Sequence, residues 1–362
     1  MSEQNNQQQQ KGFFGTAASG LGNTLGAATN TVGKGVQGIT DTTGNVVSAG
    51  GKGLGDAVTG VTKGVGDTTK DFYVKSMQFT QNAHQDVYPA IDPSRPEHSL
   101  VGKVAVITGA SRGIGALAMV PAFFKAGIKG IVLLASNATK LAAVEQSVKE
   151  ANPSIETLTY ALDISDSKAV ESAFGKIKET FGHADVLVNT AGVMTGDGPK
   201  LHETDPEQWW KNFEINGKGT YLVIRSFLRL LPGPDTPATI INVSSWQAFF
   251  TIPPVGAYMM SKFILDALAT YVAVEYPNVN AVSMHPGLVP TDMLREPFRS
   301  LFNLDSPELV GGTAVWLCQE KAKFLSGRFI AANWDVEDLL SHKDEIVSKD
   351  LLKLTLKGDF GV

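Results

Sequence analysis

Two residues spaced four apart, Tyr258 and Lys262, have side chains that together can transfer a proton. Residues at i and i+4 lie on one face of a helix. A free tyrosine, with a pKa of about 10, is a poor acid or base at neutral pH, but a neighbouring ammonium favours the phenolate and lowers that pKa. Ser245 lies upstream, where its hydroxyl can hold a carbonyl or alcohol oxygen, and Asn216 follows a further helical pattern. The set indicates proton transfer at an oxygen, although a tyrosine and a lysine four apart are by themselves common on helix faces.

A glycine-rich turn indicates a second kind of chemistry, the binding of a phosphate. The apolar run Val104–Thr108 leads into Gly109-Ala110-Ser111-Arg112-Gly113-Ile114-Gly115, and a helical pattern follows. Glycines so placed permit a tight turn and a close approach of the backbone to a pyrophosphate, and the next helix offers free N–H groups to the anion. The alternative is a structural turn without a ligand. Pro121, inside the expected helix, predicts a kink or an early end.

The end of the second expected strand bears on which nucleotide this turn binds. An NAD site usually has an acidic residue there, on the ribose 2′-hydroxyl. Here the strand ends Leu134-Ala135-Ser136-Asn137, without an acid that would repel a 2′-phosphate. Arg112 can pair with such a phosphate and Ser136 can hydrogen-bond it, so the sequence favours NADP(H) over NAD(H). Alternatively, Arg112 is a solvated loop arginine.

Short apolar runs alternate with helical patterns from Gly102 onward, and each run has the length of a buried parallel strand. This alternation predicts an α/β fold with a doubly wound parallel, Rossmann-like sheet, whose ligands bind at the carboxyl ends of the strands. One helix is expected to begin at Asp205, with Pro206 at its first position and Gln208 completing a capping box. The expected strands are Val104–Thr108, Ile131–Leu134, Leu158–Leu162, Val186–Val188, Ile240–Val243, Ala281–His285 and Phe329–Ala331.

Over residues 100–340 the chain resembles the short-chain dehydrogenase/reductase family, and it is similar to fungal, NADP-preferring members. The resemblance rests on motifs that occur in the family's order. They are the turn 108–115, Asp163, Asn189-Thr190-Ala191-Gly192, Asn216 with Gly219, Ser244-Ser245, Tyr258 with Lys262, Pro286-Gly287 with Thr291, and Asn333-Trp334-Asp335. Thr190 departs from the pattern, because the family often has a second asparagine there, and this puts one local hydrogen bond in doubt.

The resemblance implies a role for each of these residues. In the catalytic set, Ser245 would orient the substrate oxygen, Tyr258 would transfer its proton, Lys262 would bind the ribose and tune Tyr258, and Asn216 would support a water relay to Lys262. Tyr258 and Lys262 would also hold the cofactor. The resemblance places Asp163 at the adenine, and Val289 and Thr291 at the nicotinamide carboxamide. The other residues that would line the cofactor are Gly109, Ser111, Arg112, Gly113, Ile114, Gly115, Ser136, Asn189, Ala191, Gly192, Pro286 and Gly287.

Two of these residues, and a histidine near them, also have simpler interpretations. Asp163 can merely cap a turn, and Asn216 can merely brace a helix. His285 invites a catalytic interpretation at a strand end, but Tyr258 already supplies the acid/base, so we expect a structural role. Histidines and cysteines show no metal-ligand spacing, and no metal is expected.

The composition excludes several classes of protein. A net charge of −5 gives no basic surface for nucleic acid. The single cysteine, Cys318, excludes a disulfide framework and fits a reducing compartment. Neither an apolar membrane span nor a secretory signal is evident, so we expect a cytoplasmic location.

The N-terminal part differs in composition from the rest. Residues 1–72 hold 16 of the 37 glycines and no proline, so we expect them to be disordered or only conditionally helical. Apolar residues recur there every 11 positions, as in Leu21, Val32, Leu54 and Val65, with Thr43 at the intervening position. Such a repeat keeps an apolar stripe aligned on a helix, and it favours contact of residues 16–72 with a lipid droplet or membrane surface. The alternative is an inert tail. We assign 73–100 to a linker, 101–335 to the catalytic domain and 336–362 to a C-terminal extension.

Apolar residues after the strands suit a small hydrophobic carbonyl or alcohol substrate. They are Met194, Trp246, Phe249, Phe250, Ile252, Pro253, Met293, Leu294 and Phe298, some of which can instead belong to the core. The family resemblance implies a homo-oligomer that pairs through helices near Asp205–Leu231 and Tyr258–Tyr276. The competing functions are a nucleotide-binding scaffold without turnover and a lipid-surface protein.

Overall fold

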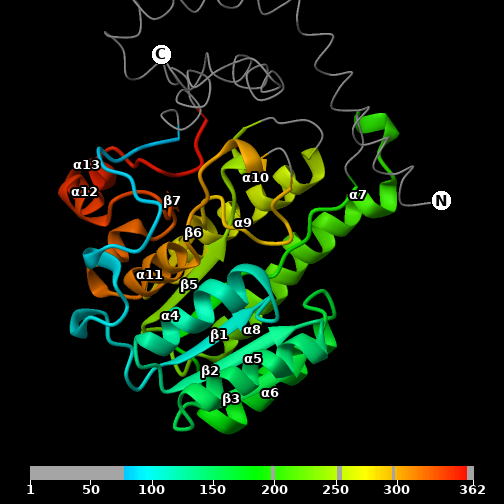
Figure 1. Ribbon diagram of the computed structural model, residues 1–362, viewed down its shortest axis with the longest axis vertical. Coiled ribbons are helices and arrows are strands. Elements are labelled where there is room, and N and C mark those ends of the chain that lie inside the picture. Colours follow the sequence, from blue (N-terminus) through cyan, green and yellow to red (C-terminus); the bar gives the residue numbers. More distant parts are fainter. Residues whose placement is uncertain (1–76, 197–199, 251–254, 296–297, 357–362) are drawn as a thin grey trace, which may run out of the picture.

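One parallel sheet organises the protein (Figure 1). The computed structural model describes residues 77–196, 200–250, 255–295 and 298–356, and within these ranges seven strands lie in the order β3-β2-β1-β4-β5-β6-β7. They are β1 (Val104–Thr108), β2 (Gly130–Ala135), β3 (Glu156–Ala161), β4 (Val186–Asn189), β5 (Ala238–Val243), β6 (Val279–His285) and β7 (Phe329–Ala331). Each expected strand is present, with its ends shifted by at most two residues. The predicted doubly wound α/β fold is confirmed.

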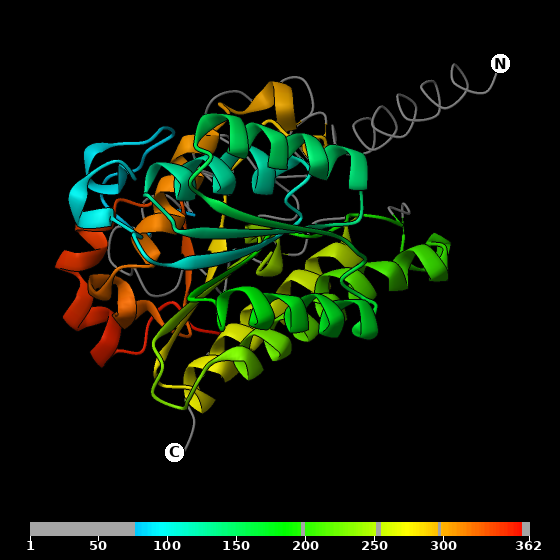
Figure 2. The same cartoon turned by 90° about the horizontal axis from the view of Figure 1, so that it is seen from below.

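Helices cover both faces of the sheet (Figure 2). Alternate residues of β1 point to opposite faces, so Ala105 and Ile107 lie in one core and Val104 and Val106 in the other. The first core is covered by α4 (Val120–Lys125), α5 (Ala138–Ala151) and α11 (Pro307–Leu317), and the second by α6 (Ser167–Phe181), α8 (Thr220–Leu230) and α9 (Gly256–Glu275). The short helices α7 (Pro206–Asn212), α10 (Phe298–Leu301), α12 (Val336–Ser341) and α13 (Lys343–Ser348) complete the described set.

The strand order reverses between β1 and β4, which makes this the topological switch point of the sheet. From β1 the chain runs outward to β2 and β3, and it then returns to β4 on the other side of β1. Helices that follow β1 and β4 therefore lie on opposite faces, and ligands of such sheets bind where the two strands end. The register pairs Thr108 with Asn189 at this point, so the glycine-rich turn and the Asn189–Gly192 segment leave the sheet side by side.

Two helices contain a widened turn. The helix after β1 begins with a π-helical stretch, Gly115–Met119, in which the Val120 N–H bonds to the carbonyl five residues back. Pro121 follows in the first turn of α4, where its missing N–H costs little. A second π-helical stretch, Phe213–Gly219, joins α7 to α8. The predicted start of α7 is confirmed, because the Asp205 carboxylate accepts a hydrogen bond from the Gln208 N–H at 2.8 Å.

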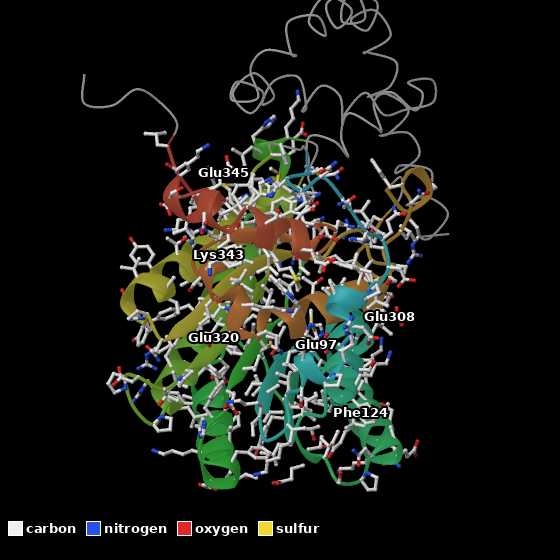
Figure 3. The ribbon with its side chains drawn as sticks, turned by 90° about the vertical axis from the view of Figure 1, so that its left-hand side faces the viewer. Glu97, Phe124, Glu308, Glu320, Lys343 and Glu345 are labelled. Atoms are coloured by element: carbon white, nitrogen blue, oxygen red, sulfur yellow. The ribbon has the colours of Figure 1, made fainter. Side chains whose placement is uncertain are left out.

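Residues 77–100, which we call the arm, pack on the domain, although the sequence led us to expect a linker over 73–100. Prolines begin two short 3-10 helices in the arm, Pro89–Ile91 and Pro96–His98. Ile91 is fully buried, and a Cβ atom at Gly312 of α11 would lie 2.5 Å from its carbonyl oxygen. The arm lies beside helices of the C-terminal third, α11 and α12 (Figure 3). Burial of its apolar residues against those helices stabilises it there.

Among the described residues, α9 is the helix that is long and apolar enough to cross a membrane. Half of it is buried inside the domain, where Leu265 is buried and Ala269 and Val272 pack in the second core. Its apolar character therefore reflects its place in the core. The repeat in residues 16–72 lies outside the described residues.

Candidate active site

The glycine-rich turn is pressed against the end of β4. A Cβ atom at Gly109 would lie 2.7 Å from the backbone nitrogen of Ala191, and a Cβ atom at Gly115 would collide with the Gly109 carbonyl oxygen. Gly109 and Gly113 have positive φ values of 66° and 55°, which side chains rarely adopt. The turn is therefore too tight for larger residues at Gly109 and Gly115, and it lies at the strand ends, where dinucleotides bind to sheets of this kind.

Thr190, which stands where the family often has a second asparagine, joins the ends of β1 and β4. Its hydroxyl donates to the Thr108 carbonyl oxygen, and the Thr108 hydroxyl accepts from the backbone N–H groups of Thr190 and Ala191 at 3.2 Å each. The ends of β1 and β4 are thus joined by side chains as well as by the ladder. Asn189, almost fully buried, donates to Asn242 of β5 at 2.9 Å, so it braces the sheet from within.

Tyr258, Lys262 and Ser245 lie together where β5 and β6 end. Tyr258 and Lys262 occupy the buried face of α9, with exposed fractions of 8% and 4%. The lysine nitrogen lies 5.6 Å from the centre of the tyrosine ring and donates to the Val243 carbonyl oxygen at 2.8 Å. Ser245 is buried, and its hydroxyl lies near enough to the phenol to favour the ionised form. The structure therefore brings these three expected residues into one place.

The electrostatics of this group differ from the expectation drawn from the sequence. We expected Lys262 to lower the pKa of Tyr258, but burial raises that pKa to about 12, and only the hydrogen bond to Ser245 opposes the rise. Burial also lowers the pKa of Lys262 to about 8, while Asp266 raises it in part. The physical reason is that removing water disfavours both charged forms. The phenol is consequently a protonated donor at neutral pH.

Asn216 ties the end of β4 to α9. Its side chain accepts from the Val193 N–H at 2.8 Å and donates at 2.9 Å both to the Val193 carbonyl oxygen and to the Ser261 hydroxyl. A Cβ atom at Gly192 would lie 3.2 Å from the Asn216 carbonyl oxygen and 3.5 Å from the Lys262 nitrogen. Asn216 is therefore a brace next to Lys262, held in the widened turn before α8, a type of turn frequent at functional sites.

The segment after β6 forms the other side of the strand-end site. Pro286 and Val289 are buried, and Gly287 has a φ of +81°. The Thr291 N–H bonds to the Val289 carbonyl oxygen at 2.7 Å. A Cβ atom at Gly113 would contact the Thr291 methyl group at 3.7 Å, so this segment reaches the glycine-rich turn.

The residues expected at the adenosine end lie on the surface. Arg112 is exposed and lies 3.6 Å from the Asp292 carboxylate. Ser136 is exposed at the end of β2, and the adjacent Asn137 caps α5 by accepting from the Lys140 N–H. One oxygen of Asp163 caps a turn by accepting from the N–H and hydroxyl of Ser165. No acid follows β2 directly, as the sequence indicated.

Some of the apolar residues that we expected to line the substrate site belong to the core. Trp246 packs against the rings of Phe250, His285, Phe329 and Trp334. Phe249 and Met293 remain 39% and 37% exposed. Ile252 and Pro253 lie outside the described residues, and the same holds for the side chain of Phe298.

His285 and Cys318 have surroundings that do not favour reactivity. Burial lowers the pKa of His285 to about 3, and its Nδ1 accepts from the Trp246 N–H at 3.4 Å, which supports the structural interpretation. Burial raises the pKa of the Cys318 thiol. Among the described residues, His, Cys, Asp and Glu side chains form no group of three that would hold a metal ion.

Sequence reasoning missed Asp266, which is buried on α9 one turn beyond Lys262. Burial raises the pKa of its carboxyl to about 7, against the lowering effect of Ser244, Ser283 and Lys262. In the present rotamers both serine hydroxyls donate to backbone carbonyls of α9, at 3.4 and 3.3 Å. The spacing of 258, 262 and 266 was the available signal, because i, i+4 and i+8 share a helix face.

The fold and these residues define a dinucleotide-binding α/β protein with a tyrosine–lysine pair at its strand ends. Residues 103–300 match the model of the short chain dehydrogenase family. Short chain dehydrogenase mpl6 of Monascus purpureus is 38% identical over 282 residues, which cover 75% of this chain and 94% of that protein. Short chain dehydrogenase pigC of Monascus ruber is 39% identical over 287 residues, covering 76% and 92%.

Solved structures have the same fold. A dehydrogenase/reductase from Sinorhizobium meliloti 1021 is 27% identical with a TM-score of 0.59, over 67% of this chain and 97% of that one. A protein from Escherichia coli CFT073, complexed with NADPH, is 23% identical with a TM-score of 0.60, over 66% and 99%. The chain belongs to the short chain dehydrogenase family. It is accordingly an oxidoreductase acting on CH–OH groups, in a family that binds a nicotinamide cofactor.

Proposed function

We propose that the protein is an NADP(H)-dependent oxidoreductase that interconverts a hydrophobic alcohol and its ketone or aldehyde. The observation that carries the proposal is the burial of Tyr258 and Lys262 on one face of α9, with the buried Ser245 near the phenol. Three polar side chains so placed, at strand ends where nucleotides bind, are suited to proton transfer at a substrate oxygen.

In the direction of reduction, the Ser245 hydroxyl donates to the carbonyl oxygen and holds it beside the phenol. A nicotinamide held by Val289 and Thr291 would supply the hydride that the carbonyl carbon takes up. Tyr258 gives its proton to the oxygen, which becomes the alcohol hydroxyl, and the phenolate that remains is stabilised by the ammonium of Lys262. In oxidation the same proton moves back. Asn216, which is bonded to Val193 and Ser261, keeps the β4 end and α9 in register and supports a water relay to Lys262.

The preference for NADP(H) rests on charge at the adenosine end. Arg112 is exposed beside the turn, no acid follows β2 directly, and Ser136 is exposed next to it. A guanidinium is a strong partner for a phosphate. The related fold from Escherichia coli CFT073 is complexed with NADPH. Asp163 keeps one carboxylate oxygen free of its turn for the adenine.

A substrate panel tests the proposed function. Hydrophobic ketones and aldehydes are offered to the full-length protein, and the absorbance of NADPH is followed beside that of NADH. Turnover with NADPH on at least one hydrophobic carbonyl supports the proposal. Tight binding of NADPH without turnover on any of them would favour the competing function, a nucleotide-binding scaffold.

We also propose a lipid-surface role for residues 16–72, which the structure does not describe. The 11-residue repeat of apolar residues supports it, since a stripe on a helix can insert into a lipid surface. The protein would then work in the cytoplasm, peripherally on a lipid surface such as a lipid droplet.

A further inference from the structure

The segment after β6 is held from outside the site by one buried carboxylate. Asp305 is 5% exposed and accepts a hydrogen bond from the Leu288 N–H at 2.6 Å. Its own N–H donates to the Leu288 carbonyl oxygen at 3.0 Å. A Cβ atom at Gly287 would collide with the same carboxylate. Asp305 therefore clamps the backbone immediately before Val289 and Thr291.

Asn333, which follows β7, orients the clamp. Its amide nitrogen donates to the free oxygen of Asp305 at 2.8 Å and to the His84 carbonyl oxygen of the arm at 3.0 Å. Its carbonyl oxygen on the main chain accepts from the His84 N–H at 2.8 Å. One side chain thus links the arm to the carboxylate that holds the segment after β6.

The arm is itself firmly attached at this point. The His84 ring bonds to Asp335 at 2.6 Å and stacks on Tyr88 at 3.6 Å. The Tyr88 hydroxyl accepts from the Val336 N–H at 2.8 Å. Next to Asp305, Ser306 donates from its backbone to Gln85 and from its hydroxyl to Asp86. The geometry of the clamp consequently depends on contacts that reach from residue 84 to residue 336.

We propose that Asp305, oriented by Asn333 and the arm, is a positioning residue that sets the grip of the Gly287–Thr291 segment on the nicotinamide end of the cofactor. This inference rests on the proposed function, in which Val289 and Thr291 hold the carboxamide. Asp305 acts only through the backbone of Leu288, so it affects the nicotinamide end and leaves the adenosine end, at the other side of the turn, unchanged.

The test compares two ligands of the full-length protein, NADPH and 2′,5′-ADP, which lacks the nicotinamide half. Asp305→Asn loses a charge-assisted hydrogen bond, and we expect its affinity for NADPH to fall roughly tenfold. Its affinity for 2′,5′-ADP should stay within about twofold of the wild-type value. Asn333→Ala removes the orienting amide and is expected to act in the same direction. It also keeps the test decisive if Asp305→Asn fails to fold.

Asp185→Asn is the matched control. Asp185 likewise holds a backbone N–H, that of Val104 at 2.9 Å, but at the amino end of the sheet, so its replacement should change neither affinity. Equal losses for both ligands in Asp305→Asn and Asn333→Ala, or no loss, would overturn the inference. Failure of the wild-type protein to bind either ligand would instead overturn the proposed function.

Discussion

The ammonium nitrogen of Lys262 lies 5.6 Å from the centre of the Tyr258 ring and bonds to the Val243 carbonyl oxygen. This hydrogen bond holds the lysine nitrogen at the end of β5, at a fixed distance from the tyrosine ring. Because both groups are buried, the phenol stays protonated, with a pKa of about 12, and the lysine carries its charge only up to a pKa of about 8. The phenol therefore has a proton to give at neutral pH, but its raised pKa makes it a weaker acid than a free tyrosine.

Replacing Tyr258 by phenylalanine should abolish turnover and spare cofactor binding, because the ring fills the same space but has no proton to give. Loss of a general acid typically lowers the rate by about 10²–10⁴. The measurement is the steady-state rate on the best substrate of the panel, with NADPH titration alongside. Tyr271→Phe, at an exposed tyrosine of the same helix, is the control. A variant that keeps more than about a tenth of the wild-type rate would contradict the acid/base role.

Replacing Arg112 by alanine should weaken NADPH and leave NADH almost unaffected. The lost contact to the 2′-phosphate is worth roughly 1.5–3 kcal/mol, or about 10- to 100-fold in affinity. The pair with Asp292 should matter little, since both side chains are largely exposed. Titration of both cofactors is the measurement, with Arg229→Ala on the surface of α8 as the control. Equal weakening of NADPH and NADH would show that Arg112 does not bind the phosphate.

Much of the fold was predictable because the strands are short apolar runs between helices with polar faces. The glycine-rich turn was predictable because it follows the first strand of the strand–helix alternation, although such a turn by itself also occurs without a ligand. The pKa of Tyr258 was not, because a spacing of four gives proximity but not burial, and burial reverses the expected shift. Thr190 likewise needed the structure to show that its hydroxyl reaches Thr108.

The arm and Asp305 were unpredictable for a different reason. Three prolines and several polar residues in 73–100 have the composition of a linker, and only the distant helices α11 and α12 provide the surface on which Ile91 is buried. Asp305 and Asn333 are 28 residues apart, and neither belongs to a spacing that sequence patterns relate to phosphate or proton chemistry. Contacts of this kind depend on tertiary packing.

Replacing Asp266 by asparagine should make stability less dependent on pH. Burial raises the carboxyl pKa from 3.8 to about 7, so between these values the unfolded chain binds fewer protons than the folded one, and stability falls as pH rises. Near pH 7 the raised pKa lowers the free energy of unfolding by an amount on the order of 1–4 kcal/mol. Melting temperatures at about pH 4.5 and 7.5 are compared, two values near the ends of that window. The melting temperature of the variant, relative to that of the wild type, should be higher at about pH 7.5 than at about pH 4.5.

The control for Asp266 is Asp235→Asn, at an exposed carboxylate in the loop before β5, which should track the wild type at both pH values. If the difference in melting temperature between Asp266→Asn and the wild type is the same at both, the carboxyl does not titrate in this window.

An exposed apolar stripe on α9 predicts a homo-oligomer. Met260, Phe263, Tyr271 and Val274 are between 45% and 75% exposed, at spacings that place them on one helix face, opposite the buried catalytic face. Such a stripe is stabilised by a second copy of the helix. Phe263→Glu with Val274→Glu should raise the dissociation constant at least about tenfold, since carboxylates would be buried. Light scattering gives the mass, and Val347→Glu on α13 is the control. A monomeric wild-type protein at micromolar concentration would contradict the prediction.

A peptide spanning residues 16–72 should become helical on neutral lipid and remain largely unordered in water. Its glycines each cost about 1 kcal/mol relative to alanine in a helix, and only burial of the stripe that includes Leu21, Leu25, Val32 and Val36 can offset that cost. Five lysines in residues 1–72 are balanced by five acids, so packing into a neutral surface is favoured over attraction to anionic lipid.

Circular dichroism with and without a neutral lipid emulsion measures the helicity. A matched peptide with the stripe leucines and valines replaced by serine should stay unordered in both. If the natural peptide does so too, residues 16–72 are a spacer and the lipid-surface role is wrong.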